Sequence, residues 1–368
     1  MNGTGIQKTK LLIVIPSLEC GGTEKFAMQV CEHINTDLFE VTLAVLNNAH
    51  PFYTLTNPVI KLVDLKARRV RTSLFAIRRT IREERPAIIF SLSNHLNLYM
   101  AIYRRQFPPQ IKLVARESSI PSFTNKRSGY PYFYNYLMKK FYHRFDAIVC
   151  QSAYMQQDLV QHFGVPAAKT HIICNMAGDA ALKALSAAPE NDRSRVRKFI
   201  TVARLSGEKG IDRLIKSVAL LPFSVQYHII GEGPMRSALE KLIIELGLQE
   251  KVFLPGRKGR PFEGLEDADL FLLDSDYEGF PNVLLEAGVL GIPVVARDAP
   301  GGINEIIRNG ENGFLVSETG TAAFAAGIEK ALQYKFSREN IIALTKERFP
   351  TEKAISALEE LFLTIGTA

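Results

Sequence analysis

Two carboxylates with seven residues between them flank a segment that the sequence predicts to pass from a strand into a helix. Glu278 follows the apolar run 270–273, and Glu286 falls on a helix expected to begin near Pro281 or Asn282. Proline suits a first helical position, because the N–H group that it lacks would have no partner there. The free N–H groups of such a turn can hold an anion. This arrangement suggests a site for a sugar nucleotide.

Cationic side chains and glycines follow two other strand-like runs. Arg204 and Lys209 lie five positions apart after the run 199–203, and such a pair can clamp a diphosphate. Gly21 and Gly22 follow the first apolar run, where two glycines let the backbone approach a phosphate closely. Solvated loop cations and an ordinary tight turn are the alternative interpretations of these two features.

A further glycine turn, 231–234, follows the run 226–230. The dinucleotide-binding fingerprint needs a third glycine, and also an acidic residue about 20 positions further on at the end of the next strand. The sequence therefore does not predict a dinucleotide site at this turn.

The strands and helices that must carry these residues follow the same alternating pattern in two successive series. Short apolar runs alternate with helix-length segments, which predicts parallel sheets covered by helices on both faces. The expected strands of the first series are 11–15, 41–45, 87–90, 112–115 and 147–150, and those of the second are 199–203, 226–230, 252–254, 270–273 and 293–296. The prediction is an α/β chain with two doubly wound, Rossmann-like domains facing a cleft, in which ligands bind beyond the carboxyl ends of the strands.

The length of 368 residues also favours two domains, because a single core rarely grows so large. We predict an N-terminal domain over residues 1–178 and a C-terminal domain over residues 196–348. The segment between them, 179–195, is rich in Ala and Pro and is expected to be a linker. The last segment, 349–368, is expected to form an amphipathic helix.

Composition excludes several classes of protein. The hydrophobic content of 46% and the charged content of 23% are ordinary for a globular chain, and no apolar stretch approaches the ~20 residues that span a bilayer. The run 11–15 is too short for a signal peptide and lacks a small-residue cleavage site. Four cysteines without a C-x-x-C pair or zinc spacing indicate neither a disulfide scaffold nor a zinc site, which fits a reducing cytoplasm.

Positive charge is concentrated in one part of the first half. Residues 61–144 hold 18 Lys or Arg and 4 Asp or Glu, a balance of +14, so the remainder of the chain carries −7 of the total +7. This basic segment indicates either a surface for anionic lipid headgroups or a lipid-diphosphate acceptor, or an ordinary solvated rim with buried rings. A nucleic-acid surface is disfavoured, because no nucleic-acid-binding module is present. The interleaved aromatic residues are Phe123, Tyr130, Tyr132, Phe133, Tyr134, Tyr136, Phe141 and Tyr142.

Taken together, five ordered motifs resemble the retaining glycosyltransferase family 4, which has the GT-B fold and includes enzymes of bacterial envelope polysaccharides and lipid-linked glycans. The matching segments are 15–24, 203–210, 230–234, 278–286, and 301–305 with 309–313. The resemblance implies that Arg204 and Lys209 bind the donor diphosphate without a metal. It also implies that Glu286 holds the donor ribose and that Glu278 lies near the transferred sugar.

The same resemblance implies the remaining site residues. His95 is expected near the donor sugar, and Arg116, Glu117 and Ser118 are expected where the acceptor approaches. Phe280, Pro281 and Asn282 would line the sugar pocket, and the strand-end loops that contain Gly231, Gly233 and Arg257 would frame the base. The other donor-binding residues implied are Gly21, Gly22, Val283 and Leu284.

Retention of anomeric configuration is also implied by the resemblance. We favour front-face substitution, because the sequence nominates no carboxylate nucleophile for a double displacement. The segment Asp274-Ser275-Asp276 has the spacing of an Asp-x-Asp metal motif, so a Mg²⁺ or Mn²⁺ site is conceivable. We disfavour it, since Asp274 stands where the family commonly has proline, and we expect no cofactor.

The function predicted is transfer of a hexose or N-acetylhexosamine, UDP-linked, to a polyprenyl- or other lipid-linked glycan in cell-envelope biosynthesis. The expected location is the cytoplasm, peripheral at the inner face of the membrane. One alternative is a GT-B sugar-phosphate synthase, phosphorylase or epimerase acting on water-soluble substrates. The other is a non-catalytic sugar-nucleotide-binding membrane adaptor. The presence of all four charged residues of the expected donor site argues against it, namely Arg204, Lys209, Glu278 and Glu286.

Overall fold

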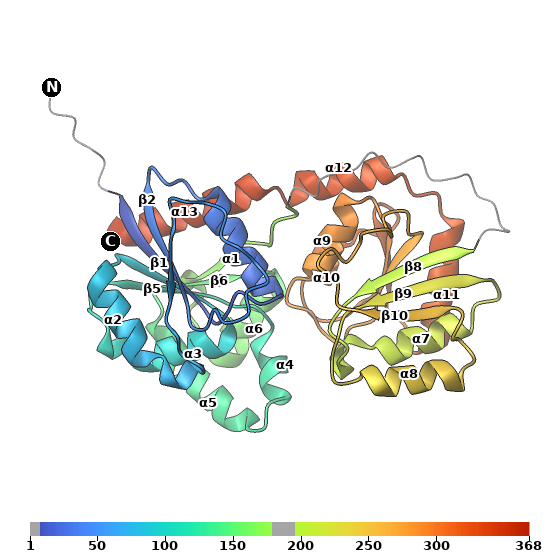
Figure 1. Ribbon diagram of the computed structural model, residues 1–368, viewed down its shortest axis with the longest axis horizontal. Coiled ribbons are helices and arrows are strands. Elements are labelled where there is room, and N and C mark those ends of the chain that lie inside the picture. Colours follow the sequence, from blue (N-terminus) through green and yellow to red (C-terminus); the bar gives the residue numbers. More distant parts are fainter. Residues whose placement is uncertain (1–7, 179–195, 368) are drawn as a thin grey trace. The chain divides into compact units, whose positions relative to one another are not determined.

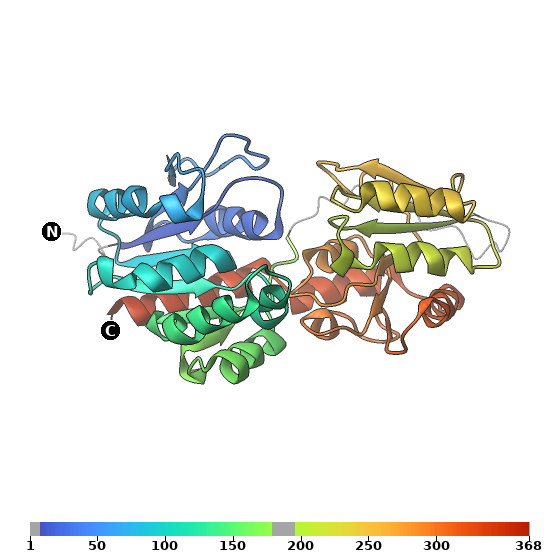
Figure 2. The same ribbon diagram turned by 90° about the horizontal axis from the view of Figure 1, so that it is seen from below.

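The computed structural model describes residues 8–178 and 196–367, which divide into two compact units (Figures 1 and 2). The first unit ends at Met176 and takes in the C-terminal segment that begins at Thr351, and the second runs from Ala177 to Pro350. The expected linker, 179–195, lies outside the described residues. None of the helices in the described ranges is long and apolar enough to cross a membrane.

The first unit contains a seven-stranded sheet in the order β3-β2-β1-β4-β5-β6-β7, and every neighbouring pair is parallel. Its strands are β1 (Thr9–Ile15), β2 (Phe39–Val45), β3 (Lys61–Asp64), β4 (Ile88–Leu92), β5 (Lys112–Arg116), β6 (Ala147–Cys150) and β7 (Thr170–Ile172). Its helices are α1 (Gly22–His33), α2 (Leu74–Glu84), α3 (Asn94–Tyr103), α4 (Pro121–Lys126), α5 (Pro131–Phe141), α6 (Ala153–Phe163) and α13 (Thr351–Thr367), with short 3-10 segments at η1 (Val70–Thr72), η2 (Arg104–Gln106), η3 (Tyr142–Arg144) and η4 (Ala167–Lys169).

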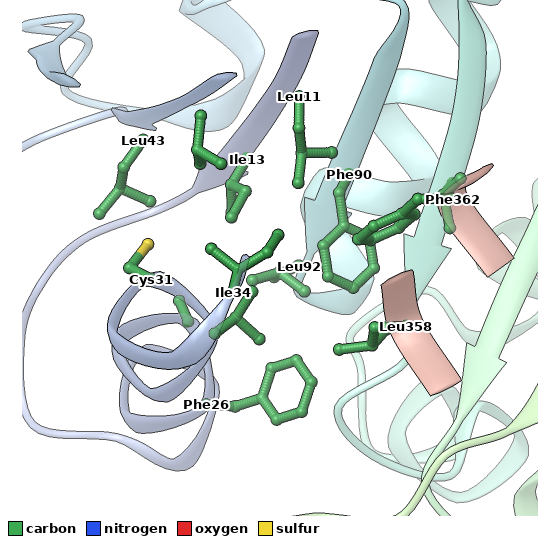
Figure 3. Packing of buried hydrophobic residues seen from close by; sticks show 14 of the residues in the cluster. Leu11, Ile13, Phe26, Cys31, Ile34, Leu43, Phe90, Leu92, Leu358 and Phe362 are labelled. Carbon is green, nitrogen blue, oxygen red and sulfur yellow. The ribbon is translucent and has the colours of Figure 1, made fainter. Parts of the chain in front are cut away.

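The central strand β1 is buried on both faces, as a parallel sheet requires. Leu11 and Ile13 point to one side of the sheet, while Leu12 and Val14 belong to the hydrophobic cluster on the other side. Figure 3 shows the first side, where Phe26 of α1 packs in the same cluster. Burial on both faces explains why this strand is a continuous apolar run in the sequence.

Helix α13 closes the first of these clusters. Its Leu358 and Phe362 are buried against the sheet, and the ring of Phe362 meets the edges of Phe90 and Phe39 at centroid distances of 5.1 and 6.1 Å (Figure 3). Edge-to-face rings at this spacing are favourable beyond the area that they bury. The C-terminal end of the chain is therefore part of the core of the first unit.

The second unit contains a six-stranded parallel sheet in the order β10-β9-β8-β11-β12-β13. Its strands are β8 (Arg197–Val202), β9 (Val225–Ile230), β10 (Val252–Gly256), β11 (Leu270–Leu273), β12 (Val294–Arg297) and β13 (Gly313–Val316). Its helices are α7 (Ile211–Ala219), α8 (Arg236–Glu245), α9 (Asn282–Val289), α10 (Ile303–Ile306), α11 (Thr321–Gln333) and α12 (Arg338–Arg348), and η5 (Gly207–Lys209) is a short 3-10 segment. The two sheets confirm the predicted fold class. Strands β3, β7 and β13 were not predicted.

Each sheet has a point where the order of the strands reverses, and the candidate site residues lie at the carboxyl ends of the strands beside it. In the first unit β1 lies between β2 and β4, and in the second β8 lies between β9 and β11. Loops that leave the two central strands at such a reversal diverge, which opens a crevice at their carboxyl ends. Gly21 lies on the loop after β1 and His95 at the start of α3, which follows β4, while the connections after β8 and β11 carry Lys209 and Glu278.

Candidate functional site

The strand-end loops of β8 and β11 bring Lys209 and Glu278 together. Lys209 Nζ lies 2.6 Å from Glu278 Oε1, and both side chains are mostly buried yet still reach solvent, with exposed fractions of 22% and 12%. The two residues are 69 positions apart in the chain. Removal from bulk water strengthens a charge-assisted hydrogen bond of this kind. The pair can therefore present a cation and an acceptor to one ligand.

The backbone around Glu278 is also fixed. Its N–H donates to the carbonyl of Pro300 at 3.0 Å, and Gly302 N donates to the carbonyls of Glu278 and Gly279. A Cβ at Gly302 would lie 2.5 Å from the ring of Phe280, so the loop can fold over that ring only with glycine there. Phe280 itself is buried and packs edge-on against Phe349 with ring centroids 5.6 Å apart. The expected sugar-pocket residue Phe280 thus has a structural role in this loop.

Arg204 lies on an exposed loop that interlocks with the glycine turn after β9. Leu205 N donates to Glu232 O, and Met235 N donates back to Leu205 O. A Cβ at Gly231 would lie 1.9 Å from Ala203 O, and one at Gly233 would lie 2.3 Å from Leu205 O. The two glycines therefore allow the close approach that holds the loop of Arg204 in place. Arg257 is exposed on the loop that follows β10.

Helix α9 begins at Asn282, as the sequence predicts, and Pro281 precedes it in an extended conformation with φ −73°. No side chain caps its first turn, and within that turn Leu284 N donates to Pro281 O at 3.0 Å. The N-terminal end of a helix favours negative charge. Asn282 and Val283 of that turn are half-buried, and Pro281 and Leu284 are buried. Glu286 lies one turn further along the helix and is half-buried.

The segment that resembles a metal motif is instead held by arginines. The carboxylate of Asp274 is almost fully buried and receives Arg213 Nε at 2.9 Å on one oxygen and Arg297 Nε at 2.5 Å on the other. A second nitrogen of Arg213 meets Asp276 at 2.8 Å. Burial raises the pKa of Asp274, although both guanidinium groups act in the opposite direction. Across the part of the chain that the structure describes, no three His, Cys, Asp or Glu side chains cluster as metal ligands.

In the first unit, the glycine pair leads directly into α1. Gly21 precedes the helix in an extended conformation and makes no side-chain cap, and Gly22 is exposed. The first turn also contains Glu24, whose pKa is raised chiefly by burial. A carboxylate beside a helix N-terminus competes for the N–H groups that would hold a phosphate.

The expected catalytic histidine lies after β4, next to a strained residue. Ser93 has φ 107°, a conformation that costs a non-glycine residue of order 1–3 kcal/mol and that collects at functional sites. Asn94 Oδ1 accepts from both the N–H and the hydroxyl of Ser118, at 3.0 and 2.7 Å. His95 is exposed, and its ring meets the edge of Tyr134 at 6.1 Å. The structure therefore brings Ser118 to Asn94, the residue that precedes His95 at the start of α3.

Arg116 and Glu117 are placed differently from expectation, because their side chains are buried. Arg116 lies over the ring of Phe26 at 3.7 Å from the centroid, and its Nη2 donates to Asn175. Burial lowers the pKa of Arg116 to about 9, so the guanidinium remains charged at neutral pH. Direct contact of an acceptor with these two side chains, as predicted from the sequence, conflicts with this burial.

Glu117 belongs to a buried polar network on the other side of the sheet. Its Oε1 accepts from Asn97 Nδ2 and from the hydroxyl of Tyr142, both at 2.9 Å, and Gln151 donates to its backbone carbonyl. Burial raises the pKa of Glu117 to about 7. Within the described ranges, no partner reaches Glu117 Oε2 or the Nε and Nη1 atoms of Arg116. Sequence reasoning missed this network, because a consecutive Arg-Glu pair is usually solvated.

Family models match both units. Residues 20–177 match the model described as Glycosyltransferase Family 4, and residues 186–348 match the model described as Glycosyl transferases group 1. The chain is 28% identical over 339 residues to the N-acetylgalactosamine-N,N'-diacetylbacillosaminyl-diphospho-undecaprenol 4-alpha-N-acetylgalactosaminyltransferase of Campylobacter jejuni, covering 88% of this chain and 90% of that protein.

Solved structures share the fold across nearly the whole chain. The apo form of the lipopolysaccharide outer core galactosyltransferase WaaB superposes with a TM-score of 0.75 at 19% identity, covering 97% of this chain and 99% of that one. Anabaena HepE in complex with UDP-glucose gives 0.75 at 20% identity, with coverages of 96% and 99%. Sucrose-phosphate synthase from Thermosynechococcus elongatus gives 0.81 at 17% identity, with coverages of 97% and 99%.

Proposed function

The chain belongs to the glycosyltransferases of family 4, and we propose that it moves a hexose or N-acetylhexosamine from a UDP-sugar to a hydroxyl of a lipid-linked glycan in envelope biosynthesis. Glycosyl transfer follows from the family models on both units. The choice of UDP is supported by HepE, whose structure holds UDP-glucose. The lipid-linked acceptor is supported by the Campylobacter relative, whose name specifies a diphospho-undecaprenol substrate.

The observation that carries the proposal is the contact of Lys209 with Glu278 at the end of the central strands of the second unit. In the proposed complex, Lys209 and the exposed Arg204 bind the diphosphate, while Glu278 accepts hydrogen bonds from the sugar hydroxyls. The N-terminal end of α9, which no side chain caps, attracts the anion through the helix dipole, and Glu286 on the same helix accepts from the ribose. In the first unit, Gly21 and Gly22 lead into another uncapped helix, and His95 is exposed near the start of α3.

We further propose that the anomeric configuration is retained. The hydroxyl oxygen of the acceptor forms a bond to the anomeric carbon as the bond from that carbon to the diphosphate oxygen breaks. The proton of the hydroxyl passes to the departing phosphate oxygen on the same face, so the products are the glycoside and UDP. Lys209 and Arg204 stabilise the charge that develops on the diphosphate, which is why we propose that no metal is required.

A thermal-shift screen tests the donor. A ligand that binds the folded state raises the melting temperature, so UDP-N-acetylglucosamine, UDP-N-acetylgalactosamine and UDP-glucose should each be compared with the matching GDP- and ADP-sugars. We expect the largest shift from a UDP-sugar, with or without EDTA, and its loss in Lys209→Met. Equal shifts from all bases would contradict the proposed donor, and a shift that disappears with EDTA would contradict metal independence.

The acceptor side of the proposal depends on helix α5. Four aromatic residues there and just before it are exposed, at 73% for Tyr130, 89% for Tyr132, 58% for Phe133 and 57% for Tyr136. Lys139 and Lys140 are exposed at the end of the same helix. Cations beside aromatic rings suit the interface of an anionic membrane, where a lipid-linked acceptor resides. We therefore propose a peripheral location at the cytoplasmic face of the membrane.

A further inference from the structure

Ser275 lies between the arginine-bound Asp274 and the loop that carries Glu278. It follows Asp274 directly, just after β11, and its side chain is fully buried. Its Oγ donates a hydrogen bond to Glu278 Oε1 at 2.7 Å, and Lys209 Nζ meets the same oxygen at 2.6 Å. Two donors on one oxygen fix the rotation of the carboxylate and leave Oε2 to accept from a ligand.

The segment that carries Ser275 is fastened to the segment that carries the lysine. Asp276 N donates to the carbonyl of Glu208 at 2.8 Å. Arg213 donates to the backbone carbonyl and the carboxylate of Asp274, and also to the carboxylate of Asp276. Ser275 therefore lies between two residues that are both tied to the start of α7.

Gly210 lets these two segments come together. Its φ is +60°, and a Cβ at this position would lie 2.2 Å from the carbonyl oxygen of Asp274. The close approach places Lys209 and Ser275 beside the same oxygen of Glu278. Because both donors stand on fixed backbone, the carboxylate between them has little freedom to turn.

We propose that Ser275 is a positioning residue that holds Glu278 Oε1 beside Lys209, so that Oε2 faces the sugar of the donor. This inference rests on the proposed function, in which Glu278 binds the transferred sugar. The hydrogen bond is charge-assisted and shielded from water, so it orients the carboxylate strongly. Without it, Glu278 keeps only a contact with a long, flexible lysine and spends part of its time turned away from the sugar.

Turnover of Ser275→Ala in the full chain tests the proposal. With UDP-N-acetylglucosamine and UDP-glucose as probes and released UDP as the readout, we expect kcat to fall by roughly 10- to 100-fold, with KM for the donor changing less than about threefold. Thr201→Val is the matched control. It removes another buried hydroxyl of the second unit, which lies on β8 and donates to Leu272 O at 2.6 Å, and it should leave kcat unchanged.

A double-mutant cycle separates positioning from a general structural effect. If Ser275 acts through Glu278, then Ser275→Ala should cause no further loss in residual turnover when it is added to Glu278→Ala. Ser275→Thr keeps a hydroxyl and should recover most of the lost kcat, and Ser275→Cys, of similar size and a weaker donor, should fall between. A further tenfold loss in the double variant would overturn the proposal.

The outcomes also distinguish this inference from the proposed function. If Glu278→Ala keeps full turnover, the proposed role of Glu278 fails, and the positioning role fails with it. If Glu278→Ala collapses while Ser275→Ala keeps the wild-type kcat and melting temperature, only the positioning role fails.

Discussion

At the ends of β8 and β11, Lys209 and Glu278 pair at 2.6 Å and remain partly exposed. At the end of β5, Arg116 and Glu117 also have ionisable side chains, but these are buried, and each has polar atoms without a hydrogen-bond partner among the described residues. A paired charge that solvent can reach is able to exchange its partner for a ligand at modest cost, whereas a buried charge must keep the partners that it has. The comparison therefore supports the proposal that the second unit's pair binds a ligand, and it favours structural support as the role of the first unit's pair.

The largest effect is expected from Lys209→Met, which should lower the rate of transfer by about 10²–10³-fold, as loss of one donor to a developing negative charge typically does. Stability should change little, because the lysine is partly exposed. Initial rates and thermal melts measure the two effects. Lys216→Met, on α7 and paired with Asp212 at 3.6 Å, is the control and should be neutral in both. Wild-type rates in Lys209→Met would remove the distinction between the two units.

Glu117→Gln should change stability and its pH dependence. Because burial raises the pKa of the folded carboxyl from 4.5 to about 7, the folded state holds a proton that the unfolded state has released. The free energy of unfolding should therefore fall by about 3 kcal/mol as pH rises from about 4.5 through about 7. In Glu117→Gln this fall should be absent, so the stability of the variant relative to the wild type should be higher at pH 8 than at pH 5.

Urea denaturation at pH 5 and pH 8 measures this difference. The control is Glu40→Gln, which removes an exposed carboxylate of the first unit and should leave the pH dependence of the wild type intact. If the free energy of unfolding depends on pH in the same way in Glu117→Gln and in the wild type, ionisation of this carboxyl does not destabilise the fold. The contrast between the buried pair of the first unit and the partly exposed pair of the second would then fail.

Asp274→Asn tests whether ion pairs in the second unit also support its structure. The variant leaves Arg213 and Arg297 beside a neutral amide, at an expected cost of about 2 kcal/mol in the free energy of unfolding. This is below the 3–5 kcal/mol of a fully buried pair, because the arginine side chains are 27% and 25% exposed. Urea midpoints measure it, and an unchanged midpoint would contradict a structural role for this carboxylate.

The interior strands of both sheets could be predicted because burial on two faces makes them continuous apolar runs. Strands β6 and β11 coincide with the predicted runs 147–150 and 270–273. Strand β3, Lys61–Asp64, was missed because it lies at the sheet edge, where it is short and mostly exposed. Its polar residues resemble those of a loop. Strand β7, at the opposite edge, was missed because it has only three residues, of which two are polar.

The site could be predicted only as far as single loops allow. The ends of apolar runs mark where strand-end residues such as Lys209 and Glu278 must lie, and the parallel fold brings such ends to one edge. Contacts between residues far apart in the chain leave no local pattern. Arg213 reaches Asp274 across 61 positions, and this contact turns a segment with metal-motif spacing into an ion-paired support. Likewise, nothing local distinguishes a buried Arg116 from a solvated one.

The smallest expected effect concerns the surface of the first unit, where exposed cations accompany exposed rings. If α5 meets an anionic membrane, the double variant Tyr132→Ser with Phe133→Ser should lower binding to phosphatidylglycerol vesicles by several-fold, since each ring buries apolar area at the interface. Co-sedimentation at low and high salt measures it. Phe75→Ser removes a ring of α2 that is 81% exposed and should have no effect. If both variants lose vesicle binding equally, the rings of α5 have no specific role at the membrane and form an ordinary solvated rim. The distinctive feature of the first unit would then be its buried polar network.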